Sequence, residues 1–309
     1  MAILLITTPG PVRGWIEALN AQLPGEDLRV WPDRVGDPTD IDIALAAHQV
    51  ESSYEALPNL KLVMSLRAGI DDLLAAPIPP DVIVARAQEP GGNKMFDETV
   101  LLHVLRHHKR MPDIVAAQPR HEWIDVEVRR AEERNVGFLG LGLIALSGAR
   151  LCRDVGFNVA AWTRTPKSEP GIESFHGDDR LPPFLARTEI LMNLLPVTAE
   201  TENILNAKLF AMLPKDACVI NLGRGEHVVD RDLMDALDSG HLHSATLDVF
   251  RTEPLPADHP FWSHPRITVT PHRSRRQRPD MILPQVVENI RRFRAGEELL
   301  QVVDRSRGY

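Results

Sequence analysis

The chain has 309 residues, of which 43% are hydrophobic and 25% charged, and its formal net charge at pH 7 is −8. This composition excludes a disordered chain, a fibrous repeat and a small domain built on disulfides, and the acidic balance argues against a general nucleic-acid binder. The length indicates about two domains.

The two cysteines, Cys152 and Cys218, each lie in an apolar stretch. We interpret them as buried reduced thiols of a cytoplasmic enzyme rather than a redox pair or a metal site. The apolar start, residues 1–7, has no basic segment before it and predicts a buried strand, not a signal peptide or a membrane span. We expect no metal, nucleic acid or membrane partner, because the histidines lack ligand spacing and the charge is acidic.

Short apolar runs alternate with helical patterns in the first third of the chain. Runs of this length predict strands buried on both faces of a parallel sheet. The predicted strands are Ala2–Thr8, Leu28–Trp31, Ile41–Ala46, Leu60–Leu66 and Val82–Ala87, and between them Val12–Gln22 and Tyr54–Leu57 are typical of helices, with Gly69–Leu74 as a further intervening segment. A longer helical pattern follows at about Asp97–His108, where we expect His107 and His108 to face solvent, and then a polar stretch with prolines at Met111–Arg134.

The alternation restarts in the second half and predicts a second α/β unit. Its strands are Asn135–Gly140, Asn158–Thr163, Glu189–Leu194, Ala217–Leu222, Ala245–Phe250 and Ile267–Thr270; its helices are Leu143–Asp154, Asn206–Met212 and Arg231–Ser239. A last helix, Met281–Ala295, ends at Gly296, a natural residue after a helix. We therefore predict an α/β fold with two flavodoxin/Rossmann-like domains, each a parallel sheet with helices on both faces.

The most specific local motif is the sequence Gly140-Leu141-Gly142-Leu143-Ile144-Ala145, between a predicted strand and a predicted helix. It fits the G-x-G-x-x-G/A dinucleotide fingerprint in the context that the fingerprint requires. Gly140 would permit a tight turn, Gly142 would let the backbone approach a pyrophosphate, and Ala145 would allow close helix–strand packing. The start of the helix would offer free N–H groups to the phosphates.

The end of the following strand indicates which dinucleotide binds. A protein that binds NAD usually carries Asp or Glu there, about 20 residues after the glycines. This chain instead has Thr163, Arg164, Thr165 and Lys167. These side chains suit a 2′-phosphate through charge-assisted hydrogen bonds, so we predict a preference for NADP(H), with NAD(H) possible.

Three reactive side chains follow apolar strands of the second half: Arg224, Glu253 and His272. The carboxyl ends of parallel strands are where open α/β sheets bind ligands, so all three can meet in one crevice. Together with the glycine loop, the ordered motifs Asn221-x-x-Arg224-Gly225, Asp248-Val249-Phe250-x-x-Glu253-Pro254 and Thr270-Pro271-His272 resemble the D-isomer-specific 2-hydroxyacid dehydrogenases, with the glyoxylate/hydroxypyruvate reductase A branch as the nearest match.

That resemblance covers nearly the whole chain and implies a cytoplasmic, NADPH-preferring reductase of small 2-keto acids, usually a homodimer. It implies a substrate-binding domain at residues 1–98 plus about 281–309 and a dinucleotide-binding domain at 99–280, with residues 97–134 as a candidate dimer contact. Further cofactor contacts are implied for Leu195, Pro196, Thr201, Leu222, Gly223 and Asp248.

The chemistry expected of the three reactive residues follows from their types. Arg224 would grip the substrate carboxylate with two N–H groups and orient it. His272 would donate a proton to the carbonyl oxygen during reduction and act as the base in the reverse direction. Glu253 would bind the far ring nitrogen of His272, hold its orientation and stabilise the imidazolium.

Two segments depart from the family pattern. In the loop expected to bind the substrate carboxylate, Ala68 and Gly69 match but Arg67 stands where glycine is usual, and four arginines, Arg273, Arg275, Arg276 and Arg278, follow His272. These arginines are either solvated or paired across a dimer interface; or Arg67 with Arg273 or Arg275 binds a second anionic group of the substrate; or the bulky side chains obstruct the site.

Two other functions stay open at this level. Glu253 argues against a formate-type dehydrogenase, which would carry an amide there. A corepressor-like, cofactor-sensing binding protein of the same fold can keep all three reactive residues, so the sequence does not exclude it. The physiological keto acid and the direction in the cell are not decided by the sequence.

Overall fold

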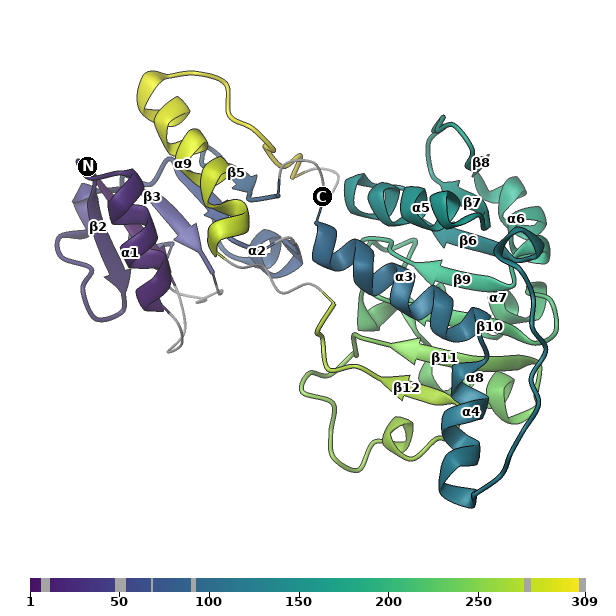
Figure 1. The fold of residues 1–309 in the computed structure, drawn as a ribbon. Helices are drawn as coiled ribbons and strands as arrows, with labels where there is room; N and C mark the ends of the chain where they lie inside the picture. Colours follow the sequence, from purple (N-terminus) through teal and green to yellow (C-terminus); the bar gives the residue numbers. More distant parts are fainter. Residues whose placement is uncertain (7–11, 48–53, 68, 90–92, 275–278, 306–309) are drawn as a thin grey trace. The chain divides into compact units, whose positions relative to one another are not determined.

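A computed structural model describes residues 1–6, 12–47, 54–67, 69–89, 93–274 and 279–305. The chain forms two compact units: Met1–Gly92 together with Arg276–Tyr309, and Asn93–Arg275. Figure 1 labels their helices and strands in chain order. The predicted fold class is confirmed, because both units are parallel sheets with helices on their two faces.

The first unit is a five-stranded parallel sheet in the flavodoxin-type order β2-β1-β3-β4-β5. Its strands are β1 (Ala2–Ile6), β2 (Asp27–Trp31), β3 (Ile41–Ala46), β4 (Leu62–Ser65) and β5 (Ile83–Arg86), and its helices are α1 (Val12–Gln22), the 3₁₀ turn η1 (Pro38–Asp40), α2 (Asp71–Ala75) and α9 (Pro279–Ala295). Every residue of β1, β3 and β4 is buried, as expected for strands covered on both faces.

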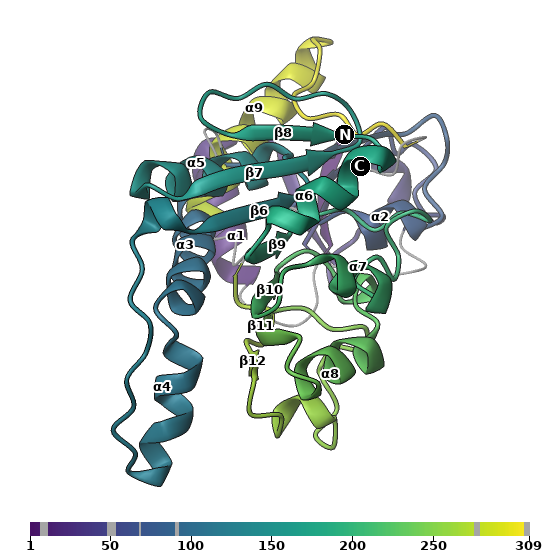
Figure 2. The ribbon, with the colours of Figure 1, turned by 90° about the vertical axis from the view of Figure 1, so that its right-hand side faces the viewer.

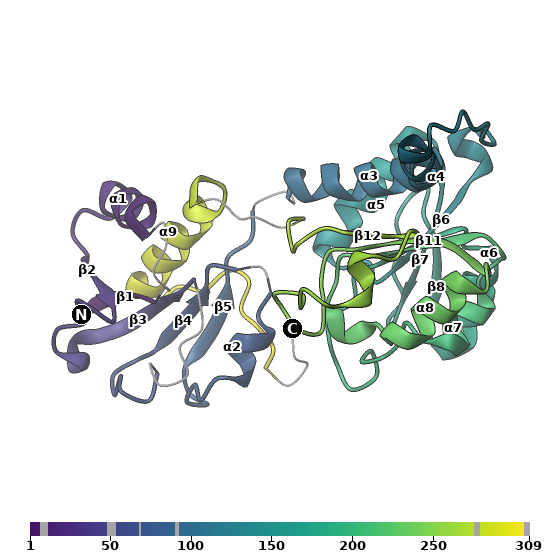
Figure 3. The same ribbon diagram turned by 90° about the horizontal axis from the view of Figure 1, so that it is seen from below.

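Helices α1 and α9 cover one face of this sheet, and α2 lies on the other (Figure 3). On the first face, Ile282 and Val286 of α9 are fully buried against Ile3 of β1 and its neighbours. On the second face, the segment Tyr54–Leu57 packs into the core but forms a turn, so the predicted helix there is wrong. The reason is local: Pro58 follows, and a residue before proline is disfavoured in helical conformation.

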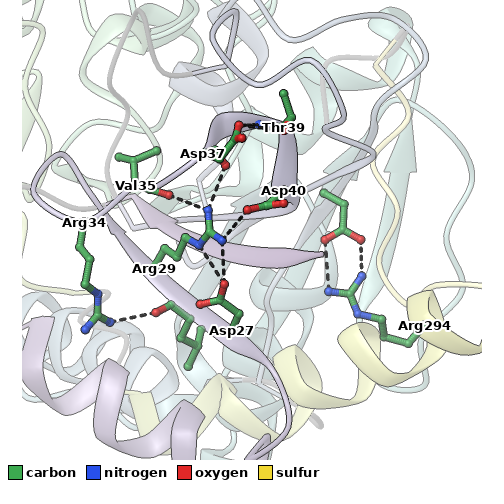
Figure 4. A network of polar contacts seen from close by, with 10 residues as sticks. Asp27, Arg29, Arg34, Val35, Asp37, Thr39, Asp40 and Arg294 are labelled. Atoms are coloured by element: carbon green, nitrogen blue, oxygen red, sulfur yellow. Dashed lines mark hydrogen bonds and ion pairs between the residues drawn. The ribbon is translucent and has the colours of Figure 1, made fainter.

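Arginine side chains tie distant parts of the first unit together (Figure 4). Arg294, in the last turn of α9, donates to Glu26 at 2.8 and 2.9 Å and also pairs with Asp42 of β3. Arg29 of β2 donates to Asp27, Asp40 and the carbonyls of Val35 and Asp37, at 2.8 to 3.0 Å. Charge-assisted bonds of this kind hold the late helix α9 and the β2–β3 connection against the sheet.

The second unit is a seven-stranded parallel sheet in the order β12-β11-β10-β9-β6-β7-β8. Its strands are β6 (Asn135–Leu139), β7 (Asn158–Thr163), β8 (Glu173–His176), β9 (Ile190–Asn193), β10 (Ala217–Asn221), β11 (Leu242–Leu247) and β12 (Ile267–Val269). Its α-helices are α3 (Lys94–His108), α4 (Met111–Ala117), α5 (Leu143–Val155), α6 (Leu181–Arg187), α7 (Ala207–Met212) and α8 (Asp230–Asp238), and its 3₁₀ turns are η2 (Gln118–Arg120), η3 (Ala131–Glu133), η4 (Asp178–Arg180), η5 (Gly225–His227) and η6 (Pro260–Trp262).

Helices α3 and α5 cover one face of this sheet, and α6, α7 and α8 cover the other (Figure 2). The chain runs outward in one direction from β6 to β8 and in the other from β9 to β12. The strand order therefore reverses between β6 and β9, and ligands of open α/β sheets bind at such a switch point, at the carboxyl ends of the strands. Strand β8 is not among the predicted strands, because this edge strand is largely polar and lacks an apolar run.

The expectation that His107 and His108 face solvent is wrong, since each is 2% exposed. His107 bonds the hydroxyls of Ser244 and Thr246 on β11 at 3.0 and 2.9 Å, and burial lowers its pKa to about 3. Ser244 also contacts Nδ1 of His243 at 2.8 Å, whose Nε2 lies 2.9 Å from Asp113.

The Asp113 carboxylate can only accept hydrogen bonds. If His107 and His243 are both neutral, this fixes which group donates in each hydrogen bond of the chain from Asp113 to Thr246. Nε2–H of His243 donates to Asp113, the Ser244 hydroxyl to His243, Nδ1–H of His107 to Ser244, and the Thr246 hydroxyl to His107. The hydroxyl groups of β11 thus supply the partners that make the buried His107 tolerable on α3. His243 itself has a side chain only 10% exposed.

Both cysteines are buried, which raises the pKa of Cys152 to about 12 and of Cys218 to about 11. Within the described ranges, no helix is both long and apolar enough to cross a membrane. Among the same residues, no three His, Cys, Asp or Glu side chains are grouped so that they could hold a metal ion.

Candidate active site

The glycine loop joins β6 to α5 at the reversal of the strand order. Gly140 has a φ of +89° and donates its N–H to the Trp162 carbonyl at 2.9 Å, and a Cβ there would lie 3.3 Å from the Leu194 carbonyl oxygen. A glycine is needed because L side chains rarely adopt this φ. Gly142 caps α5, and a Cβ on it would meet nothing within 4 Å, so its backbone is accessible.

The helix after this loop presents unsatisfied donors. Helix α5 begins at Leu143, whose side chain is 51% exposed, and its first intrahelical bond runs from Leu146 to Gly142. The N–H groups of Leu143 and Ile144 precede that bond and have no acceptor within the helix. Ala145 is 2% exposed, which matches the predicted close packing of helix on strand, and Leu141 is buried as well. These features fit an anionic group at the helix start.

The residues predicted to read the ribose phosphate follow β7. Arg164, Thr165 and Lys167 are exposed, whereas Thr163 is buried and its hydroxyl donates to the Thr165 carbonyl at 2.7 Å. The Thr163 hydroxyl therefore holds this turn. Hydrogen bonds from Thr198 and from its own amide lower the pKa of Glu200, and the charge of Arg164 adds to this effect.

The loop after β9 is closed by Thr201. Its hydroxyl donates to the Pro196 carbonyl at 2.6 Å and accepts the Thr198 N–H at 2.8 Å. Leu195 is buried, and its N–H donates to the Asn193 side chain at 3.3 Å. Thr201 therefore shapes a loop next to Gly140, and any contact of its hydroxyl with a cofactor stays a prediction.

Three fully buried polar side chains support the loops after β9 and β10: Asn193, Asn221 and His227. The Asn193 amide donates to Asn221 and lies 2.9 Å from Nδ1 of His227, and the Asn221 amide donates to the Arg224 carbonyl at 2.8 Å. Nδ1 of His227 accepts the Arg224 N–H, so Nε2 carries the proton that bonds the Pro196 carbonyl at 3.1 Å. Burial lowers the pKa of His227, in keeping with this neutral form.

Sequence reasoning did not identify Asn193 as a functional residue. The signal was present: Asn193 and Asn221 each end an apolar run, where an amide has no reason to be buried unless it bonds neighbouring loops. The network fixes the predicted contacts Leu222 and Gly223, because the Gly223 N–H donates to the Asn221 side chain at 3.2 Å.

Arg224 and Gly225 join the loop after β10 to the loop after β11. The half-buried Arg224 donates one guanidinium N–H to the Gly223 carbonyl at 2.8 Å. A Cβ on Gly225 would lie 1.9 Å from the carbonyl carbon of Phe250, so this glycine lets two backbone segments touch. The contact brings Arg224 into the neighbourhood of Glu253, whose carboxyl group responds to the arginine's charge.

His272 and Glu253 form the hydrogen-bonded pair predicted from the sequence. Nδ1 of His272 lies 2.7 Å from Oε2 of Glu253, and the Phe250 N–H donates to Oε1 at 2.9 Å. Burial alone would raise the pKa of Glu253, but these two hydrogen bonds and the charges of His272 and Arg224 outweigh it and lower the pKa. The His272 side chain is 37% exposed, which leaves Nε2 as the ring nitrogen available to a substrate.

Asp248 holds the backbone on both sides of His272. Its carboxylate is fully buried and accepts from the Thr270 hydroxyl at 2.6 Å, the Arg273 N–H at 2.9 Å, and both the N–H (3.0 Å) and the hydroxyl of Ser274. The Asp248 carbonyl also accepts the His272 N–H at 2.8 Å. His272 has a φ of +47°, which is unfavourable for a residue with a side chain, and these bonds keep it there.

The structure thus brings the glycine loop, Leu195, Pro196, Arg224, Glu253 and His272 onto strand ends of the second unit. Arg67 and Gly69 belong to the first unit, where Arg67 donates its N–H to the Ser65 hydroxyl at 3.1 Å. Their predicted contact with a substrate stays a prediction. Ala68, Arg275, Arg276 and Arg278 lie outside the described residues.

Known proteins are similar to this chain in sequence and fold. Residues 101–274 match the family model for the NAD-binding domain of D-isomer specific 2-hydroxyacid dehydrogenases. The chain is similar to glyoxylate/hydroxypyruvate reductase A of Yersinia enterocolitica, with 38% identity over 301 residues, 96% of either protein.

Two solved structures are similar over essentially the full length of this chain. The D-isomer specific 2-hydroxyacid dehydrogenase from Xanthobacter autotrophicus Py2, in complex with NADPH and MES, has a TM-score of 0.94 and 41% identity, over 100% of this chain and 99% of that one. The NADPH-dependent glyoxylate/hydroxypyruvate reductase from Sinorhizobium meliloti, in complex with NADP and sulfate, has a TM-score of 0.93 and 32% identity, over 100% of both chains.

Proposed function

The chain belongs to the D-isomer specific 2-hydroxyacid dehydrogenases, and from that membership we propose that it reduces small 2-keto acids of the glyoxylate and hydroxypyruvate type to D-2-hydroxy acids with NADPH. The observation that carries this proposal is the 2.7 Å pair between His272 and Glu253 in the unit that also holds the glycine loop. We assign cofactor binding and the reacting residues Arg224, Glu253 and His272 to this second unit, and we keep Arg67 and Gly69 of the first unit as predicted substrate contacts.

The proton of the reaction passes through Nε2 of His272. Because Nδ1–H donates to Glu253, the protonated imidazole carries its second proton on Nε2 and can give it to the carbonyl oxygen of the keto acid. In the reverse direction, neutral Nε2 accepts the hydroxyl proton. Glu253 fixes the plane of the ring, and the Phe250 amide fixes Glu253.

The second unit also positions both reactants. The guanidinium of Arg224 binds the substrate carboxylate and sets the carbonyl against His272. The accessible backbone of Gly142 and the first N–H groups of α5 suit the pyrophosphate of the dinucleotide. NADPH supplies the hydride when it is bound, and the protein supplies orientation and charge.

Steady-state reduction of about a dozen 2-keto acids, with NADPH and NADH side by side, tests this function. We expect glyoxylate and hydroxypyruvate to be turned over, with NADPH preferred. Tight NADPH binding without turnover of any keto acid would overturn the proposal and support the cofactor-sensing alternative.

Arg164 and Lys167 carry the proposed preference for NADPH. Replacing both with alanine should raise the KM for NADPH by about 10- to 100-fold, since each loses a charge-assisted bond to the 2′-phosphate, and should leave the KM for NADH nearly unchanged. Arg231→Ala, which removes an exposed arginine on α8, is the control. An equal rise for both cofactors would contradict the assignment.

We also propose that the protein is a homodimer formed through residues 111–134. Helix α4 and the segment after it extend from the rest of the second unit (Figure 2). Trp123 is fully exposed, Val128 is 82% exposed, and Val115 on α4 is 46% exposed. Apolar groups exposed together in this way mark a protein interface.

Trp123→Ser should therefore weaken the dimer by about 30-fold or more, as loss of an interface tryptophan commonly does. The measurement is molar mass by light scattering across a dilution series. Trp262→Ser removes a half-exposed tryptophan from η6 and should leave the mass unchanged. A wild-type monomer at micromolar concentration would contradict the proposal.

A further inference from the structure

We infer that Arg273 selects 2-keto acids that carry a second anionic group, with a 2-keto dicarboxylic acid as the representative substrate. This inference rests on the proposed function and names its substrate class. It starts from the position of Arg273 directly after His272, so the two Cα atoms are about 3.8 Å apart. Both residues are exposed.

The backbone of Arg273 is fixed relative to the reactive histidine. The Arg273 N–H donates to Oδ1 of Asp248 at 2.9 Å, and the next N–H, of Ser274, donates to Oδ2 at 3.0 Å. The His272 N–H bonds the carbonyl of the same aspartate. The buried carboxylate and carbonyl of Asp248 hold the backbone at Arg273 and on both sides of it, so the Arg273 side chain starts from a defined point next to the His272 backbone.

The charge of Arg273 is not used by the unit that contains it. In the described part of the chain, no acidic side chain pairs with its guanidinium and no acceptor binds it. The two carboxylates nearest in the site are occupied: Glu253 by His272 and the Phe250 amide, Asp248 by residues 270–274. Other arginines of this unit have acidic partners, among them Arg129 and Arg134 with Glu189, Arg150 with Glu169, Arg187 with Glu173 and Arg231 with Asp235.

The site therefore offers two arginines with different tasks. Arg224 takes the carboxylate next to the carbonyl group, and its guanidinium is partly fixed by the Gly223 carbonyl. Arg273, on the far side of His272 in the chain, can take a carboxylate or phosphate at the other end of the same molecule. A planar guanidinium suits both anions through two parallel N–H bonds. Glyoxylate has no such second group.

The test compares kcat/KM for oxaloacetate and 2-oxoglutarate with kcat/KM for glyoxylate, in the wild type and in Arg273→Gln. We expect the substitution to lower the dicarboxylate-to-glyoxylate ratio about tenfold, mainly through the KM of the dicarboxylic acid. Arg273→Lys should retain part of the ratio, and added salt should lower the wild-type ratio. A phosphorylated keto acid, 3-phosphohydroxypyruvate, shows whether the second anion is preferred as phosphate.

Arg231→Gln is the matched control, because this arginine is 79% exposed on α8 and pairs with Asp235 in the next turn of the same helix. It should leave the ratio unchanged. A ratio that is unchanged in Arg273→Gln, or equal losses for both substrate classes, overturns the inference while keto-acid reduction itself stands. If the wild type turns over no keto acid at all, the proposed function fails and the inference fails with it.

Discussion

His272→Asn should lower kcat for keto-acid reduction by about 10²- to 10⁴-fold, because the substitution removes the proton donor but leaves a polar side chain in place of the imidazole. An asparagine amide can donate hydrogen bonds but is not an acid that can transfer a proton to the carbonyl oxygen. Asparagine also tolerates positive φ, so the +47° backbone at this position should persist. The measurement is steady-state kinetics of keto-acid reduction.

Binding of NADPH, followed by fluorescence, serves as the control and should be nearly unchanged in His272→Asn. A variant that keeps more than about a tenth of the wild-type kcat would remove His272 from the proton-transfer role.

Asp248→Asn should lower kcat by about 10²-fold and reduce the free energy of unfolding by about 1–3 kcal/mol. An amide can replace one carboxylate oxygen, but its NH₂ group then faces donors. The Ser274 hydroxyl can turn to accept, whereas the Ser274 N–H cannot, so one buried donor loses its partner. The backbone that holds His272 then relaxes from its left-handed conformation.

The kinetic constants distinguish this positioning role from the cofactor contact predicted for Asp248. Loss of kcat with an unchanged KM for NADPH supports positioning, and a raised KM with intact kcat supports the cofactor contact. Thermal unfolding measures the predicted loss of stability separately from the kinetic effect. Asp238→Asn, at a side chain that is 73% exposed, should change neither.

The spacing of motifs along the sequence was sufficient to predict the pair of Glu253 and His272 and the turn at Gly140. The motifs show which residues come directly after strands. In a parallel sheet, these residues all lie at the carboxyl ends of the strands, along one edge of the sheet. Glu253 and His272 follow different strands and meet for that reason. The requirement for glycine at position 140 is likewise local, since it depends on the positive φ of one turn. Gly142 has a φ of −70° and open space around it, so its glycine suits the approach of a ligand rather than the fold.

Buried polar networks could not be predicted in the same way, because their members come from distant segments. His107 and Ser244 are 137 positions apart, and the sequence around His107 gives no signal of the hydroxyl groups that make its burial tolerable. Asp248 shows the same limit: its place in a motif identified it as functional, but only the fold shows that its oxygens bind residues 270–274. Edge strand β8 was missed because polar edge strands lack the apolar signal.

The position of α9 has a consequence for synthesis on the ribosome. Its residues Ile282, Val286 and Ile290 cover a face of the first sheet, yet they are translated after the whole of the second unit. Strands such as β1 and β3 therefore emerge early, and the part of this face that α9 covers stays open while about 180 further residues are added. The second unit is continuous in sequence and can fold as soon as it is synthesised. The first unit begins first on the ribosome but completes its fold last, so its nascent sheet is the part of the chain that we expect chaperones to protect.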